Sequence, residues 1–238
     1  MARANYVKSA QKDIYQFGKK VEYVSQKGKR SGQTLSKIDR TVPRDGKDLV
    51  YIAKGESYYW WQFKNSISKN ISKSRPRNSQ LTQSNYLSTL YGIQESMEDF
   101  SASEASEVAE FIDDIKGQLE ELKDTTEESL NNMPEGLQQG STGELLQERI
   151  DALDSAISEL EEIDTDYEEP EEDDIIEELK DDVEYEPTEE EEMDSEFNID
   201  EKKKELVSEE DIEQHKADKM QEWIDERIEE INGISLEG

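Results

Sequence analysis

The sequence lacks cysteine and contains one histidine. Without cysteine the chain can form no disulfide, no thiolate nucleophile and no cysteine-ligated zinc site. His215 lies among charged residues on the polar side of an expected helix, so we predict an ordinary solvated side chain. Glycine-rich phosphate loops, GxGxxG and GxSxG motifs are missing as well. These absences predict a protein that is not an enzyme and needs no cofactor.

Apolar residues are scarce, at 32% of the chain against 37% charged residues. Such a composition cannot offset the entropy of ordering every residue, so we expect part of the chain to stay loose. No apolar run approaches the ~20 residues that span a bilayer. The amino terminus has basic residues but no apolar segment behind them, unlike a secretory signal. We therefore expect a cytoplasmic protein.

A metal site is not expected either. Residues 164–175, DTDYEEPEEDDI, place Asp164 and Asp166 at alternating positions, as in a calcium-binding loop. However, Glu169 stands where the loop needs its turn glycine, and Ile175 stands where it needs a bidentate glutamate. The segment predicts weak, nonspecific association with cations and no metal site.

Charge is strongly partitioned along the chain. Residues 1–79 hold 18 basic and 6 acidic residues, a net charge of +12. Residues 80–238 hold 10 basic and 55 acidic residues, a net charge of −45. This asymmetry indicates two functions, or one part that regulates the other.

Residues 1–80 are predicted to form a small basic antiparallel β module. The two segments 49–53 and 56–63 form the best hairpin candidate, because Gly55 between them can adopt the positive φ of a tight turn. Residues 64–80 are predicted to be a basic linker or a ragged edge strand. All the expected strands are short runs rich in β-branched and aromatic residues: 21–25, 34–39, 49–53 and 56–63.

Residues 81–163 are predicted to form an acidic antiparallel bundle of three helices. The expected caps are Thr82, Ser103 and Thr142, and Pro134 should end the second helix. The last apolar seam is too short for a lone coiled coil. Apolar residues recur three or four apart: Leu87, Leu90, Tyr91 and Met97 in the first helix; Val108, Ile112, Ile115, Leu119 and Leu122 in the second; Leu146, Ile150, Leu153, Ile157 and Leu160 in the third.

After residue 163 the order is expected to fade. Residues 164–207 are predicted to be a low-complexity acidic linker with two helical turns within 175–183. An amphipathic helix is expected over 208–232, with Gly233 as its stop. It would dock either on a partner or back on the body, through Met220, Trp223, Ile224, Ile228 and Ile231. The expected fold class is thus α+β, with a largely disordered acidic tail.

The densest aromatic cluster, YYWWQF over 58–63, lies inside the only basic region. On a strand, Tyr58 and Trp60 point one way while Tyr59 and Trp61 point the other. One interpretation is that both faces form the core of a small domain. The other is that one face stacks nucleobases while cations follow the phosphates. The candidate nucleic-acid contacts are Lys54, Trp61, Lys64, Lys69, Lys73, Arg75 and Arg77.

Two strings, IAKGESYYWWQFK (52–64) and SRPRNSQLTQSNYLSTLYGIQE (74–95), resemble uncharacterised proteins of tailed bacteriophages. Those proteins join a zinc-ribbon-like β module to an RPSxLT motif and a helix ending in YAIQE. The matching residues here are Arg77, Ser79, Leu81, Thr82 and Tyr91 to Glu95. The relatives carry cysteines at the knuckle positions and this chain has none, so the resemblance implies a module in which aromatic residues replace the metal.

The function that we expect is binding. In the first hypothesis the basic module contacts nucleic acid or a nucleoprotein complex, and the acidic tail modulates that contact. In the second, the acidic helices imitate DNA and block a host DNA-binding protein. A role as a virion or assembly component is the third. The resemblance places all three in the cytoplasm of an infected host cell.

Overall fold

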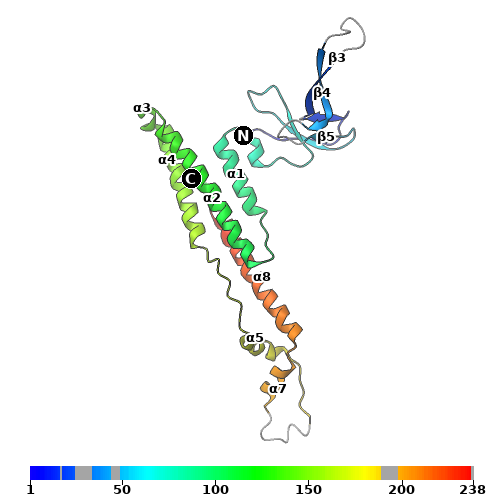
Figure 1. Cartoon of the computed structure of the whole chain (residues 1–238), viewed down its shortest axis with the longest axis vertical. Coiled ribbons are helices and arrows are strands. Elements are labelled where there is room, and N and C mark those ends of the chain that lie inside the picture. Colours follow the sequence, from blue (N-terminus) through cyan, green and yellow to red (C-terminus); the bar gives the residue numbers. More distant parts are fainter. Residues whose placement is uncertain (17, 25–33, 44–48, 189–197, 237–238) are drawn as a thin grey trace. The chain divides into compact units, whose positions relative to one another are not determined.

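A computed structural model of the chain describes residues 1–16, 18–24, 34–43, 49–188 and 198–236. The chain forms two compact units, Met1–Gly92 and Ile93–Gly238, and the division falls inside helix α1 (Asn85–Glu98). Small antiparallel sheets make up much of the first unit, whereas the described part of the second is helical (Figure 1). The predicted α+β fold is confirmed.

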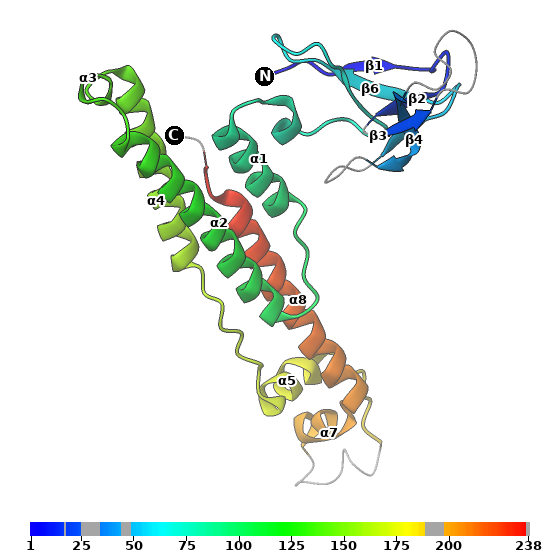
Figure 2. The ribbon, with the colours of Figure 1, turned by 45° about the horizontal axis from the view of Figure 1, so that its top comes forward.

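Within the described residues, the strands of the first unit form three small antiparallel sheets (Figure 2). The largest has the order β1-β6-β7, and the others pair β2 with β5 and β3 with β4. The strands are β1 (Asn5–Val7), β2 (Ile14–Gln16), β3 (Gly18–Val24), β4 (Thr34–Pro43), β5 (Val50–Ile52), β6 (Tyr58–Trp61) and β7 (Asn70–Ser72). The four predicted strands correspond to β3, β4, β5 and β6, and β7 is the edge strand expected within 64–80.

The hairpin predicted between β5 and β6 is wrong. β5 pairs with β2, while β6 lies between β1 and β7, so the two strands belong to different sheets. Gly55 does adopt a positive φ of 96°. However, the Gly55 N–H donates to the Ala10 carbonyl at 2.9 Å, and the Ala10 N–H donates to the Glu56 carbonyl at 2.8 Å. The turn is thus paired with the segment around Ala10, and the chain leaves it toward a second sheet.

The core of the second unit lies on α2 (Ala105–Asn131). Two long helices, α4 (Ser141–Glu162) and α8 (Glu209–Gly233), both lie along α2 (Figures 1 and 2). The terminal helix therefore docks back on the body. The predicted stripe of α2 is confirmed, and that of α4 is confirmed in its buried members, joined by Ala156. The buried residues are Val108, Ile112, Ile115, Leu119 and Leu122 on α2, and Ile150, Leu153, Ala156 and Leu160 on α4.

Ion pairs fix the antiparallel register of α2 and α4. Lys116 lies 3.3 Å from Glu161, and Lys123 lies 2.6 Å from Asp154. A step of seven residues forward along α2 is thus matched by seven residues backward along α4. The hydrogen bond to Asp154 raises the pKa of Lys123 above its ordinary value. These cations shield carboxylates on both helices, which an acidic bundle needs.

The segment predicted to be a low-complexity linker contains ordered helix. It forms α5 (Glu172–Leu179), a short 3-10 turn η3 (Lys180–Asp182) and α7 (Ile199–Leu206), whereas residues 189–197 lie outside the described residues. The two helical turns expected within 175–183 overlap α5, whereas α7 was not expected. Composition could not show that the carboxylates of the segment meet cations from other elements. Lys204 of α7 pairs with Glu177, and Lys216 of α8 lies 2.9 Å from Glu169.

His215 is not the solvated side chain that we predicted. Its Nε2 lies 3.0 Å from a carboxylate oxygen of Glu178, and its side chain is only 21% exposed. Lys219 lies 3.4 Å from the same carboxylate. The pKa of Glu178 is lowered, first by the hydrogen bond with His215 and then by Lys219. The polar face of α8 therefore packs against α5.

Helix starts differ slightly from the expected caps. Ser84, not Thr82, caps α1, since its Oγ accepts from the Leu87 N–H at 3.4 Å. At the start of α2 the Glu107 carboxylate accepts from the Ser103 N–H at 2.7 Å, so Ser103 is a donor there. The predicted start of α8 at residue 208 is confirmed, and Ser208 caps the helix, since its Oγ accepts from the Asp211 N–H. None of the helices in the described ranges is both long and apolar enough to cross a membrane.

The loop between α2 and α4 contains α3 (Glu135–Gln138) and depends on a close backbone approach. The Gln138 side chain donates to the Leu130 and Met133 carbonyls, at 3.1 and 2.8 Å, and so caps the end of α2. A Cβ placed on Gly143 would lie 1.9 Å from the Gln138 carbonyl oxygen. Only glycine fits there without moving backbone.

The close contact between Gly143 and the Gln138 backbone predicts that alanine substitution has opposite effects at Gly143 of α4 and at Gly117 of α2. Gly143→Ala should destabilise the chain by about 1–3 kcal/mol, because the added methyl group pushes α3 away from α4. Gly117→Ala, at an exposed position of α2 with no neighbour in reach, should stabilise it by roughly 0.5–1 kcal/mol. Urea unfolding followed by circular dichroism measures both, and a stabilised Gly143→Ala variant would contradict the packing described.

Candidate nucleic-acid interface

A solvent-open cavity of about 270 Å³ lies in the basic module, where β2, β6 and the start of β7 meet. Aromatic rings form much of its wall: Tyr15, Tyr58 and Trp60. Tyr58 and Trp60 share one face of β6, as the alternation of a strand requires. Ile71 of β7 stands opposite Trp60 in the register and adds to the apolar lining. Two cations, Lys12 and Lys69, also line the cavity.

The floor of the cavity is the core of the module. Ala10, Ile52 and Ile71 form a buried cluster, against which Tyr58 and Trp60 pack. Tyr15 is held from its other side by stacking on Tyr51, with ring centroids 4.8 Å apart. The same aromatic residues thus serve both interpretations of the sequence, because they build the core and also present ring surface to solvent.

Lys69 covers the ring of Trp60. Its Nζ lies 3.8 Å from the ring centroid, within the range of a cation–π contact. Such a contact contributes about 0.5–1 kcal/mol at an exposed site. A base stacked on an aromatic side chain contributes about 1–3 kcal/mol. A base can therefore displace the ammonium group, which is then free to approach a phosphate.

Gln16 joins the two sheets that enclose the cavity. Its Nε2 donates to the Lys69 carbonyl at 2.9 Å, and its Oε1 accepts from the Ile71 N–H at 2.7 Å. The amide thus bonds to the edge of β7 much as a neighbouring strand would. This pairing fixes the backbone of Lys69 at the rim, and it was invisible in the sequence because β2 is only three residues long.

The structure places the predicted nucleic-acid contacts in different environments. Lys69 lines the cavity, while Lys54, Lys64, Arg75 and Arg77 are exposed. Trp61 is only 6% exposed, so it cannot stack a base without moving. Trp60, one position earlier, has the accessible ring. Lys12, Tyr15 and Gln16 were not predicted, since no strand was expected at residues 14–16.

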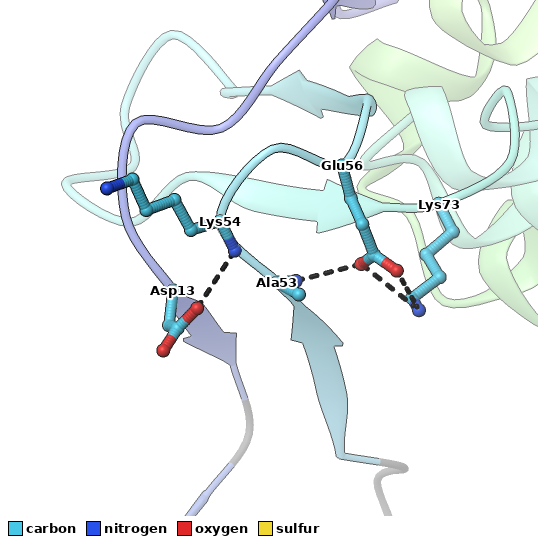
Figure 3. A network of polar contacts seen from close by, with 5 residues as sticks. All are labelled: Asp13, Ala53, Lys54, Glu56 and Lys73. Atoms are coloured by element: carbon cyan, nitrogen blue, oxygen red, sulfur yellow. Dashed lines mark hydrogen bonds and ion pairs between the residues drawn. The ribbon is translucent and has the colours of Figure 1, made fainter.

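Lys73 belongs to a network that holds the turn after β5 (Figure 3). The Glu56 carboxylate accepts from the Ala53 N–H at 2.8 Å and lies 3.3 Å from Lys73 Nζ. The Asp13 carboxylate accepts from the Lys54 N–H at 2.8 Å, while the Lys54 ammonium extends away from the network. The Ala53 N–H, followed by Lys73, lowers the pKa of Glu56. Part of the charge of Lys73 is therefore already engaged by Glu56.

The predicted partner-docking residues of α8 are divided between core and half-buried surface. Ile224 and Ile231 are fully buried within the chain. Met220, Trp223 and Ile228 are half-buried, and the Trp223 ring lies 5.5 Å from that of Tyr167. A partner could use the buried pair only by displacing α8 from the body. Within the described residues, no group of three or more histidines and carboxylates could hold a metal ion.

Comparisons of the chain with protein-family models, with curated proteins and with solved structures find no match. The resemblance to proteins of tailed bacteriophages stays a prediction. The function is therefore inferred from the geometry of the basic module.

The Glu56 network predicts a pH-dependent contribution to the stability of the module. Because the folded pKa of Glu56 is lowered, its stabilisation is present above its ordinary pKa of 4.5 and is lost as the pH falls through the lowered value. Glu56→Gln should reduce the unfolding temperature near neutral pH by a few degrees. The difference from the parent chain should vanish in acid, once the pH lies below the lowered pKa of Glu56.

Tryptophan fluorescence measures this in a Trp223→Phe background, where Trp60 and Trp61 are the remaining tryptophans. Glu56→Ala, which also removes the acceptor for Ala53, serves as the comparison and should be less stable than Glu56→Gln near neutral pH. An equal loss for Glu56→Gln at both pH values would contradict the charged contact.

Proposed function

We propose that the chain is a non-enzymatic binding protein whose basic β module contacts nucleic acid. The observation that carries the proposal is the cavity with Trp60, Tyr58 and Tyr15 in its wall and Lys12 and Lys69 beside them. Proteins that bind single strands combine such rings with cations that follow the backbone. If the resemblance to phage proteins holds, the protein acts in the cytoplasm of the infected host cell.

The charge of the module supports the same function. A net charge of +12 over residues 1–79 attracts polyanions and speeds their encounter with the surface. Exposed cations lie both before and after β7, the strand that supplies Ile71 to the cavity. They are Lys64 and Lys69 on one side, and Arg75 and Arg77 on the other. A backbone that passes the cavity would meet cations at each end of this strand.

We further propose that the acidic second unit modulates binding by competing for the module. Its cations are largely engaged with its own carboxylates, as in the pairs of Lys116, Lys123 and Lys216. The remaining carboxylates give residues 80–238 a net charge of −45. A covalent tether keeps this polyanion at a high effective concentration near the basic module.

The direct test is a salt series of anisotropy titrations with the full chain and labelled single-stranded oligonucleotides. Lys64→Gln/Arg75→Gln should weaken binding and flatten the plot of log affinity against log salt by about 0.7 for each phosphate that the variant no longer neutralises. Lys202→Gln/Lys203→Gln on α7 removes the same charge from the other unit and serves as the matched control.

That control should keep the parent slope. If both double variants bind alike, the module is not the contact surface. If the full chain binds no nucleic acid at low salt, the proposal fails, and the acidic helices become the candidate surface for a host DNA-binding protein.

Modulation by the second unit predicts a gain of affinity when its charge is reduced. Glu168→Gln/Glu171→Gln/Asp173→Asn removes three exposed carboxylates from the connector and from the start of α5. The full-length variant should bind the oligonucleotide more tightly than the parent at low salt, and the two should converge as screening increases. Unchanged affinity at low salt would contradict competition by this segment.

A further inference from the structure

We infer that the cavity is a subsite for one unpaired nucleobase of a single-stranded nucleic acid. This inference rests on the proposed function and deepens it, because it assigns a strand form and a specific ring, Trp60. A cavity of about 270 Å³ lies just below the range of roughly 300–1,000 Å³ that holds drug-sized ligands. Its size therefore suits a single flat heterocycle.

The wall that would receive the base is preorganised. Tyr58 and Trp60 are neighbours on one face of β6, and both pack against the Ala10–Ile52–Ile71 cluster. Trp60 is additionally fixed by the pairing of its strand on both sides, with β1 and with β7. Because the rings are already in place, a base would gain stacking area without first ordering the protein.

The two lysines at the cavity, Lys12 and Lys69, would bind the phosphates on either side of the base. Lys69 lies over Trp60, and the Gln16 amide holds its backbone at the rim. A base that enters against Trp60 takes the place of the ammonium group, whose four-carbon stem lets it turn toward the backbone of the ligand. Lys12, from the segment before β2, lines the same cavity.

The polar groups of the cavity predict little discrimination between bases. Gln16 is the amide in the described lining, and both its oxygen and its nitrogen are engaged with β7. The amide therefore serves mainly to hold β7. Stacking on a ring tolerates every base, since each has a π face. Duplex bases are already stacked and paired, so they would have to be extruded before entering.

The test compares a single-stranded oligonucleotide of roughly 12 residues with an abasic oligomer of the same length and charge, both titrated with the full chain. The oligonucleotide should bind about tenfold more tightly than the abasic oligomer, which corresponds to about 1.4 kcal/mol of stacking. Trp60→Leu, which keeps an apolar side chain on the core, should remove this difference between the two oligomers.

Trp60→Phe retains a ring and should restore most of the difference, which a merely structural role for Trp60 would not predict. Binding to a duplex should be the same for Trp60→Leu and for the parent. If Trp60→Leu does not fold, the base subsite is tested by the parent chain alone, through its affinities for the oligonucleotide and for the abasic oligomer. Equal affinities for them overturn the base subsite and leave the proposed function standing, whereas no binding to either overturns both.

Discussion

Two carboxylates that hold one turn determine where the aromatic cluster lies. Asp13 and Glu56 accept from the N–H groups of Lys54 and Ala53, so this turn is bonded to side chains instead of closing a hairpin. The chain then leaves β5, which pairs with β2, and enters β6 between β1 and β7. This change of sheet brings the Trp60 face of β6 to the residues of β2. Without it, β2 and β6 would not line one cavity.

The sequence predicted those elements whose signal is local and long enough to repeat. The helical stripes of α2 and α4, the start of α8 near residue 208 and the α+β class all follow from periodicity and helix start signals. The positive φ of Gly55 also follows from its residue type. The strands β1 and β2 were missed, because each is short and pairs with a segment that is distant in the sequence. The partner of β5 was misjudged, because pairing between distant segments is decided by contacts such as those of Ala10 with the turn.

The sequence predicted the residue types of the candidate site, aromatic and basic, but most of the residues that line the cavity differ from the predicted ones. An aromatic and basic surface was expected near residues 54–77, and the cavity contains Lys69 from that set. Alternation along a strand assigned Trp60 and Trp61 to opposite faces, yet it could not tell which face packs inward. The contributions of Lys12, Tyr15 and Gln16 depend on tertiary pairing of β2. For the same reason, α7 and the full extent of α5 required knowledge of which cations reach their carboxylates.

In the second unit, several lysines form ion pairs with carboxylates of the same unit. Lys116, Lys123, Lys204 and Lys216 each pair with carboxylates of another element, so these cations serve the fold of the acidic unit. Solvent-accessible pairs of this kind contribute little to stability individually, and their larger effect is to reduce repulsion among crowded acids. Pairing an acid with a cation inside the unit leaves its net charge unchanged. The second unit can therefore fold and still remain a polyanion, while Lys64, Arg75 and the cavity lysines keep the surface of the first unit basic.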